Sequence, residues 1–230
     1  MLNGRKLETG NRKLEALTKA VLWDLDGTVV DSEEYHWIAW RDTLAAEGVT
    51  ITRRQFLESF GQKNDRILGN WLAGTPAADT ITRIGDAKEA EYRRLAVARG
   101  LAPLPGVVDW LLRLRNAGWR QAIASSAPRL NVEVVLQALA LQDYFDAISS
   151  AEDVTAGKPD PQVFLAAATR LSVPASRCVV VEDAAAGVEA ARRAGMRCVG
   201  VSRTRLEQAD VSVGSLDELP LETFERLIAA

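Results

Sequence analysis

The sequence predicts an α/β protein: a doubly wound parallel sheet with a small, all-helical cap domain inserted after the first strand. Short, nearly continuous apolar runs alternate with helical patterns along most of the chain. Such runs are typical of parallel strands that helices cover on both faces. The alternation breaks once, between residues 33 and 104, where the periodic segments have helical spacing. A helical insert between the first strand and the next strand–helix unit explains this break.

Six apolar runs are expected to form the strands. In chain order they cover residues 19–26, 119–126, 145–150, 177–183, 197–202 and 209–213. Helices are expected between them over residues 106–118, 160–171 and 184–196. The first of these helices ends at Gly118, a C-cap signal, and the second has Pro161 near its first turn. In the first helix we expect one apolar stripe, formed by Val108, Leu111, Leu112 and Leu114.

The domain organisation follows from the position of the insert. We expect a polar N-terminal tail at residues 1–18, an α/β core at residues 19–32 and 105–230, and a helical cap at residues 33–104. The segments 31–34 and 101–106 would be the two linkers between the core and the cap.

The composition excludes several classes of function. The 230 residues include 28 basic and 31 acidic side chains, for a net charge of −3, and the basic residues are scattered. We therefore expect no nucleic-acid partner and no membrane partner. No apolar run approaches the ~20 residues of a membrane span, and the N-terminus has no apolar signal core. We expect a cytoplasmic monomer, with Cys178 and Cys198 as buried, reduced thiols on neighbouring strands.

Two carboxylates, Asp24 and Asp26, follow the first apolar run directly. The alternation of an extended chain places both side chains on one side, with Leu25 on the other. Two like charges this close are costly without a cation, and Mg²⁺ prefers carboxylate oxygens, backbone oxygens and water. Gly27 then allows a sharp turn. The alternative is a plain Asp-Gly turn with solvated acids.

Further polar residues end apolar runs or open helices. They are Ser125, Lys158, Glu182 and Asp183. In doubly wound sheets the ligand crevice lies beyond the carboxyl ends of the strands, so these groups are expected to meet Asp24 and Asp26 there. Acids, a lysine and a hydroxyl together make a metal-assisted phosphate site. An aspartate can attack phosphorus, a metal and a lysine can stabilise charge, and a second carboxylate can move the proton.

Four motifs resemble the haloacid dehalogenase (HAD) superfamily of phosphotransferases. They are DLDGT at residues 24–28, Ser125, GKPDP at residues 157–161 and VEDAAAG at residues 181–187. They occur in the family's order and spacing, and the resemblance covers residues 20 to about 220. It implies a Rossmann-like core of the HAD type.

The resemblance also implies roles for individual residues. Asp24 would be the nucleophile and Asp26 the general acid and base. Asp24, the backbone carbonyl of Asp26, and Asp183 would bind Mg²⁺, with Glu182 helping directly or through a water. The phosphoryl group would be held by Ser125, Lys158 and the backbone amides of Leu25, Asp26 and Ser126.

The insert resembles the helical cap of the branch that includes β-phosphoglucomutase, phosphoglycolate phosphatase and many sugar phosphatases. In DSEEYHWIAW, His36 would contribute to substrate handling, or else be a helix residue at the seam between cap and core. SFGQKNDRIL resembles the loop that contacts the non-reacting end of the substrate, through Gly61, Lys63 and Asn64. The mutase has an arginine where this chain has Asn64. Lys88 matches a cap lysine of the mutase, or else is a solvated helix lysine.

Together these features predict a Mg²⁺-dependent phosphatase that hydrolyses a small phosphorylated metabolite, such as a sugar phosphate, through an aspartyl-phosphate. The alternative is a β-phosphoglucomutase-type enzyme, in which a sugar hydroxyl replaces water. A minor alternative is a non-catalytic module that accepts a phosphoryl group in signalling, although such modules lack both the Asp-x-Asp spacing and a helical insert.

Overall fold

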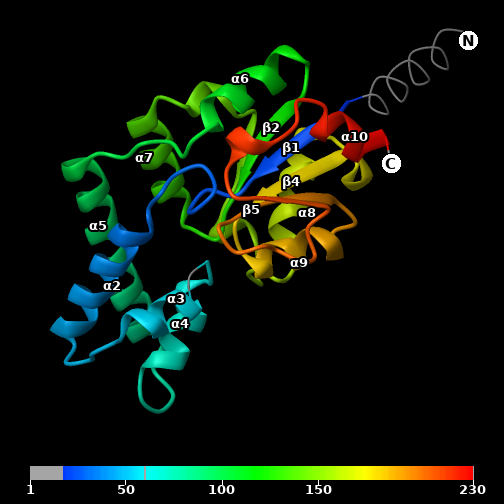
Figure 1. Cartoon of the computed structure of the whole chain (residues 1–230). Helices are drawn as coiled ribbons and strands as arrows, with labels where there is room; N and C mark the ends of the chain where they lie inside the picture. The colour runs from blue at the N-terminus through cyan, green and yellow to red at the C-terminus, as the bar shows by residue number, and fades with distance from the viewer. Residues whose placement is uncertain (1–17, 60, 230) are drawn as a thin grey trace, which may run out of the picture.

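The computed structural model describes residues 18–59 and 61–229 and contains the predicted doubly wound sheet (Figure 1). The described part holds a six-stranded sheet of order β3-β2-β1-β4-β5-β6, in which every neighbouring pair is parallel. The strands are β1 (Ala20–Trp23), β2 (Arg120–Ala124), β3 (Ala147–Ser149), β4 (Cys178–Glu182), β5 (Arg197–Val201) and β6 (Val211–Val213). Each strand lies within one of the six predicted runs, so the predicted fold class is confirmed.

Helices cover both faces of the sheet (Figure 1). The core helices are α6 (Val107–Asn116), α7 (Arg129–Leu139), α8 (Gln162–Leu171), α9 (Ala185–Arg193) and α10 (Thr223–Ala229), with short 3-10 helices η1 (Gln142–Tyr144), η2 (Ala151–Asp153), η3 (Ala175–Arg177) and η4 (Leu216–Glu218). Val21 and Trp23 of β1 pack in the cluster with α6, α7 and α10, whereas Ala20 and Leu22 pack in the cluster with α8 and α9. Both faces of β1 are therefore buried, which explains its continuous apolar sequence.

Helix α6 differs in detail from the sequence expectation. Its buried side chains are Val107, Trp110, Leu111 and Leu114, while Val108 and Leu112 are 38% and 47% exposed. The predicted stripe was right at Leu111 and Leu114 and wrong at Val108 and Leu112, because the i, i+3, i+4, i+7 spacing of the buried face begins at Val107. Gly118 has the positive φ expected of a residue just beyond the helix end. Helices α7 and α10 were not predicted.

The insert after β1 is helical, as predicted. It consists of α2 (Glu33–Ala46), α3 (Arg53–Ser59), α4 (Asn64–Trp71) and α5 (Ala78–Arg99). These helices have a core of their own, in which Trp40, Leu44, Phe56, Leu68 and Ile84 are buried. An amphipathic set of helices that buries its own apolar side chains can form a separate lobe, which Figure 1 shows beside the sheet. The cap boundaries at residues 33 and 104 stay a prediction.

Two connecting segments hold the insert at the carboxyl end of β1. The backbone N–H of Leu104 donates to the carbonyl of Val29 over 2.9 Å, and Val30 forms an antiparallel bridge with Pro103. The connections into and out of the insert therefore lie side by side. The predicted tail at residues 1–18 lies, apart from Thr18, outside the described residues.

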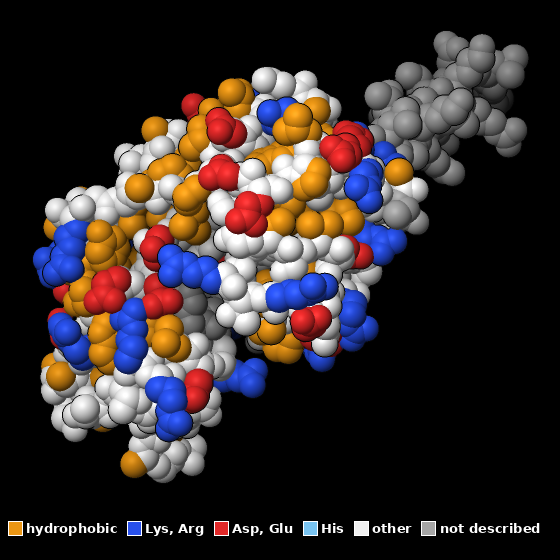
Figure 2. Space-filling model, in the orientation of Figure 1, with side chains coloured by type: hydrophobic (Ala, Val, Ile, Leu, Met, Phe, Trp, Pro, Cys, Tyr) orange, Lys and Arg blue, Asp and Glu red, His pale blue; other side chains and the backbone are white. Residues whose placement is uncertain are grey.

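The surface and the cysteines agree with the composition. On the face shown in Figure 2, Lys and Arg side chains lie interspersed with Asp and Glu rather than gathered in one basic area. Within the described ranges, no helix is both long and apolar enough to cross a membrane. Cys178 on β4 and Cys198 on the neighbouring β5 are buried and free, which confirms the prediction of reduced thiols on adjacent strands.

Candidate active site

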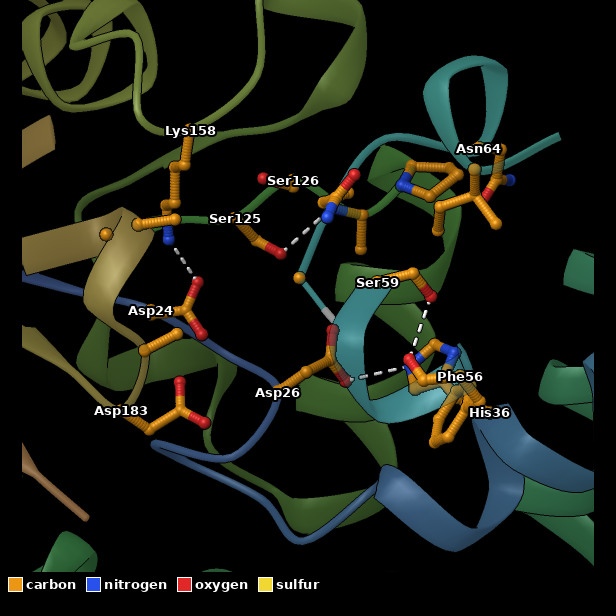
Figure 3. Close-up of a pocket in the computed structure, with 18 of the residues that line it drawn as sticks. Asp24, Asp26, His36, Phe56, Ser59, Asn64, Ser125, Ser126, Lys158 and Asp183 are labelled. Atoms are coloured by element: carbon orange, nitrogen blue, oxygen red, sulfur yellow. Dashed lines mark hydrogen bonds and ion pairs between the residues drawn. The ribbon is translucent and has the colours of Figure 1, made fainter. Parts of the chain in front are cut away.

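A pocket lies between the carboxyl edge of the sheet and the helical insert. Its core side is lined by residues that follow β1, β2 and β4 and by Lys158 from the loop before α8. Its cap side is lined by residues of α2, α3, α4 and α5 and of the α3–α4 loop. Figure 3 shows Asp24, Asp183 and Lys158 on one side of this pocket and His36 and Asn64 on the other. Parallel strands deliver their carboxyl ends to one edge, which is why residues far apart in sequence meet here.

Asp24 and Lys158 form the centre of the core side. The backbone N–H of Asp24 donates to Val181 over 3.0 Å, which continues the β1–β4 ladder one residue beyond β1 and fixes the position of Asp24. The Lys158 ammonium lies 2.5 Å from Asp24 Oδ1 and 2.8 Å from Glu182 Oε2. All three side chains are buried. Burial alone would lower the pKa of Lys158, but the charges of Asp24 and Glu182 raise it above its usual value, so the lysine is a cation.

Three carboxylates of the core side could hold a metal ion. One oxygen each of Asp24, Glu182 and Asp183 lie within 4.8 Å of one another. Burial, and then the charge of Asp24, raise the pKa of Asp183 to about 7 and that of Glu182 well above its usual value. One lysine does not offset three crowded carboxylates. An oxygen-only donor set with excess negative charge fits a hard divalent cation.

Gly27 shapes the chain beside this cluster. It has a φ of +88°, and a Cβ at this position would lie 2.1 Å from Asp183 Oδ2. A side chain would therefore displace the Asp183 carboxylate, and the left-handed backbone would be strained for any other residue. The Asp-Gly sequence thus lets the chain turn away from β1 without obstructing the acidic cluster.

Asp26 lies beside this cluster but in a different environment. Its Oδ1 accepts from Ser32 Oγ at 2.5 Å, lies 3.1 Å from His36 Nε2 and 3.4 Å from the Tyr92 hydroxyl. Burial would raise the pKa of Asp26, but His36, Ser32 and Lys88 lower it below its usual value. The Asp26 side chain is not a member of the metal-capable cluster. A ligand role through its backbone carbonyl stays a prediction.

His36 and Lys88 extend this environment into the insert. The imidazole of His36 stacks on the Tyr92 ring at 3.9 Å, and its Nδ1 lies 2.9 Å from the Lys88 ammonium. His36 lies at the seam between insert and core and also lines the pocket. Its position therefore agrees both with a role in substrate handling and with a place in a helix at the seam. Lys88 is only 3% exposed, and its interpretation as a solvated helix lysine is wrong.

The predicted phosphate-binding residues lie on the core side of the pocket. Ser125 and Ser126 follow β2 and line the pocket with Lys158, whereas the Leu25 side chain is buried in the core. Ser125 Oγ accepts from the backbone N–H of Ala127 at 3.0 Å. The Ser126 hydroxyl is buried and has no hydrogen-bond partner within the described part of the chain. A buried donor of this kind is costly unless a ligand pairs with it. The sequence analysis assigned only the backbone amide of Ser126 to phosphate binding and did not include this hydroxyl.

The α3–α4 loop contributes fewer residues than predicted. Gly61 and Asn64 line the pocket, but Lys63 does not. The Lys63 ammonium instead donates to the carbonyls of Ala151 and Val154, at 3.2 and 3.1 Å, and so joins this loop to the core loop that leads to Lys158. Lys63 was predicted to contact the substrate, whereas in the structure it connects the insert to the core.

Sequence reasoning missed three residues around Asp26 and Lys88: Ser32, Tyr92 and Glu89. Ser32 was assigned to a linker, although a serine before a helix often accepts or donates a local hydrogen bond. Tyr92 follows Lys88 by four positions, so the two share one face of α5. That spacing was the available signal for Tyr92. Glu89 had none, because a single acid on a charged helix is ordinarily solvated.

A Gly187→Ala substitution is expected to lower both stability and activity. Gly187 lies on α9, and a Cβ there would be 2.0 Å from Glu182 Cδ. Glu182 is buried and bonded to Lys158, so it cannot move to solvent without breaking that pair. We expect a loss of about 1–3 kcal/mol in the free energy of unfolding, measured by chemical denaturation, and reduced catalytic turnover.

Gly69→Ala on α4 is the matched control for that substitution. A Cβ at Gly69 would meet nothing within 4 Å. Because alanine is the better helix former by about 1 kcal/mol, this control should be neutral or slightly stabilising. Equal unfolding free energies for the two variants would show that Glu182 is not tightly held against α9.

The sheet, the insert and the site define a class of protein: an α/β enzyme with paired carboxylates and a lysine at the sheet edge, covered by a helical cap. The chain belongs to the haloacid dehalogenase-like hydrolases, whose family model matches residues 18–195.

Three relatives match most of this chain, and two of them are matched over most of their own length. The chain is 33% identical over 213 residues to β-phosphoglucomutase of Bacillus subtilis, covering 89% of this chain and 92% of that protein. It is 34% identical over 208 residues to hexitol phosphatase B of Escherichia coli, covering 87% and 93%. A 195-residue match at 36% identity to the chloroplastic protein SUPPRESSOR OF QUENCHING 1 of Arabidopsis thaliana covers 82% of this chain but 18% of that longer protein.

A solved structure agrees with the fold. The crystal structure of a mutant of CbbY from Rhodobacter sphaeroides, in complex with xylulose-1,5-bisphosphate, has a TM-score of 0.81 and 30% identity, over 88% of this chain and 96% of that chain. Similarity over nearly the whole of both chains includes the helical insert.

Proposed function

We propose that this enzyme is a Mg²⁺-dependent phosphatase that hydrolyses a small phosphorylated metabolite, in particular a sugar or sugar-alcohol phosphate. The observation that carries this proposal is the division between two neighbouring carboxylates. Asp24 is paired with a buried lysine inside an acidic cluster, whereas Asp26 is bonded to Ser32 and lies against His36. Attack on phosphorus and transfer of a proton need these two different environments.

The chemistry proceeds in two steps. A carboxylate oxygen of Asp24 attacks phosphorus, and the bond from phosphorus to the leaving-group oxygen breaks as the protonated form of Asp26 donates its proton to that oxygen. Because its neighbours lower the pKa of Asp26, the residue has to take up this proton before the step. Asp26 then takes a proton from water, which attacks the aspartyl-phosphate and releases phosphate and free Asp24. Lys158, Ser125 and the Ser126 hydroxyl would hold the phosphoryl oxygens throughout.

The acidic cluster supports the choice of metal. Asp24 and Asp183, with Glu182, would hold Mg²⁺, which supplies positive charge that offsets the repulsion between Asp24 and the phosphate. The absence of thiolate or imidazole from this cluster of the described residues favours a hard cation over zinc or copper.

The relatives support a sugar-phosphate substrate, but they differ in the part of the substrate that lies away from the reacting phosphate. Hexitol phosphatase B and a fructose-1-phosphate phosphatase of Escherichia coli are phosphatases by name, and the CbbY structure contains a sugar bisphosphate. The 33% identity to β-phosphoglucomutase favours one second candidate, a phosphosugar mutase. A cytoplasmic location and a monomeric state remain predictions from the sequence.

A panel of phosphorylated metabolites, scored by release of inorganic phosphate, tests the proposal. We expect release from at least one sugar or sugar-alcohol phosphate, and no net conversion of β-glucose 1-phosphate to glucose 6-phosphate. Isomer formation without phosphate release would make the enzyme a mutase. Turnover of neither kind across the panel would contradict the proposal.

Removal of the metal is expected to remove activity. Excess chelator should abolish phosphate release, because Asp24, Glu182 and Asp183 would be left as three crowded, mutually repelling acids, and added Mg²⁺ should restore it. Ca²⁺ should inhibit, since its larger and more variable coordination shell would misplace Asp24 for attack. Full activity in excess chelator would disprove the metal requirement.

A further inference from the structure

The cap end of the pocket, around Asn64, presents neutral polar groups and aromatic rings. Ser59, Gln62 and Asn64 line it together with Trp40 and Phe56. The Oε1 atom of Gln62 is buried and has no hydrogen-bond partner within the described residues, while its Nε2 donates to the carbonyl of Glu58. The atom left without a partner is therefore an acceptor. It needs a ligand that donates a hydrogen bond.

A buried carboxylate, Glu89 of α5, lies at the same end. Glu89 is 5% exposed and lines the pocket. Its Oε1 accepts from Asn64 Nδ2 at 2.7 Å and from Lys88 at 2.9 Å, and its Oε2 accepts from Asn131 Nδ2 of α7 at 2.5 Å. Burial would raise the pKa of Glu89, but Lys88 and His36 lower it, so the group is an anion. These donors hold that negative charge in a fixed place.

The cation nearest to Glu89 is already compensated. Lys88 pairs with Glu89, contacts His36 Nδ1 at 2.9 Å and lies over the Trp40 ring at 5.1 Å. The positive charge of Lys88 is therefore neutralised by Glu89 and is not available to a ligand.

The two cations beside Asn64 in the sequence are turned elsewhere. Lys63 donates to the carbonyls of Ala151 and Val154, and Arg66 is exposed and outside the pocket lining. Among the described pocket-lining residues, the other lysine is Lys158, which pairs with Asp24 and Glu182 at the opposite end. The cap end thus has fixed acceptors and a mutually neutralised Lys88–Glu89 pair, and no described lysine or arginine there is left to pair with a second phosphate.

We infer that the cap end of the pocket binds the uncharged hydroxyl groups of a polyhydroxy monophosphate and discriminates against a second phosphate. A phosphate dianion offers only acceptors, so it cannot satisfy Gln62 Oε1, and no described lysine or arginine at this end is left to offset its charge. Hydroxyl groups can donate both to Gln62 Oε1 and to the Glu89 carboxylate. Specificity of this kind arises as much from repulsion of the wrong ligand as from attraction of the right one. The inference rests on the proposed function and narrows its substrate class.

This discrimination also bears on the mutase alternative. In a mutase cycle, a hydroxyl of the bound sugar monophosphate attacks the aspartyl-phosphate. The bond between phosphorus and Asp24 breaks, the hydroxyl oxygen takes the phosphoryl group, and its proton passes to Asp26. The product of that step is a bisphosphate, whose second phosphate must occupy the cap end. A cap end that disfavours phosphate therefore favours transfer to water.

Binding measurements on the full chain test the inference without requiring turnover. In the Asp24→Asn background with saturating Mg²⁺, calorimetry would give the Kd of fructose 1-phosphate, fructose 6-phosphate and fructose 1,6-bisphosphate at fixed ionic strength. We expect the better monophosphate to bind at least about tenfold more tightly than the bisphosphate, because the second phosphate would lose water at the cap end without a cation to offset its charge. Equal or tighter binding of the bisphosphate, or binding of none of the three, overturns the inference.

Three variants identify the residues responsible, each measured in that same background. Glu89→Gln leaves the Lys88 ammonium without its carboxylate partner, and Asn64→Arg adds a cation. Each variant should therefore narrow the ratio of the two Kd values by about tenfold. Glu91→Gln is the matched control, because it makes the same chemical change on α5 at a residue paired with Arg94 away from the pocket lining. The ratio of Kd values for Glu91→Gln should equal that of the Asp24→Asn protein without a further substitution. Circular dichroism checks folding, and an unchanged ratio in every folded variant at positions 64 and 89 overturns the inference.

The two proposals fail in different ways. Phosphate release by the wild-type enzyme tests the phosphatase, whereas the ratio of Kd values tests the cap end. Phosphate release together with tighter binding of the bisphosphate would support the proposed function and contradict the inference about the cap end. Selective binding of monophosphates without phosphate release would support that inference and contradict the proposed function.

Discussion

Replacement of Asp24 by asparagine is expected to abolish turnover, by about 10⁴-fold or more, in a protein that remains folded. The amide is nearly the size of the carboxylate but is a poor nucleophile and a weaker metal ligand. Lys158 keeps Glu182 as a partner at 2.8 Å, so the substitution does not leave a buried ammonium unpaired. Phosphate release gives the rate, and chemical denaturation gives the free energy of unfolding.

The stability measurement makes this prediction sharper. Asp24 raises the pKa of both Glu182 and Asp183, so in chelator the Asp24→Asn variant should be at least as stable as the wild type near neutral pH. The reason is that one of three crowded acids has lost its charge. Residual activity within tenfold of the wild type would exclude Asp24 as the nucleophile. A large loss of stability would instead mean that its pair with Lys158 holds the core together.

The second large effect concerns Asp26. Asp26→Asn retains an oxygen that can accept from Ser32, and it keeps the backbone carbonyl, so affinity for Mg²⁺ and phosphate should survive. Proton transfer is lost, which is worth roughly 10² to 10⁴ in rate. A sugar alkoxide needs a proton as it leaves, whereas p-nitrophenolate hardly does. The rate should therefore fall much further with a sugar phosphate than with p-nitrophenyl phosphate.

The assay for Asp26 must separate the two chemical steps. Hydrolysis of the aspartyl-phosphate also needs Asp26, as the base, so steady-state rates would fall for both substrates. Single-turnover release of the leaving group isolates the first step. Equal slowing of both substrates in that measurement would show that Asp26 is not the general acid. The His36 and Tyr92 contacts to Asp26 would then have a structural role alone.

The sequence predicted the parts of this molecule that depend on local pattern. A strand buried on both faces is mostly apolar, so β1, β2 and β4 could be recognised from composition within short windows. Polar residues that end such strands have one place to go, because parallel strands present their carboxyl ends at one edge. The meeting of Asp24, Ser125, Lys158, Glu182 and Asp183 in one pocket follows from that rule.

Helices were less well predicted where several faces compete for burial. The stripe of α6 was placed one residue late, since Val108 and Leu112 are as apolar as the residues that the sheet covers. Helix α7 was missed altogether. Its Asn131 is nearly fully buried against Glu89 of the insert, a contact between segments 42 positions apart that no local pattern announces.

By itself, the sequence determined the fold class, the helical insert and the acids, lysine and hydroxyls that meet at the edge of the sheet, since each of these depends on neighbours in the chain. Tertiary structure alone decided what lies opposite them. It turned Lys63 toward the carbonyls of Ala151 and Val154, buried Lys88 between His36 and Glu89, and placed Glu89 beside Asn64. The physical reason is that a long charged side chain can reach several partners, and packing of the insert against the core, rather than any local preference, selects the one that satisfies it.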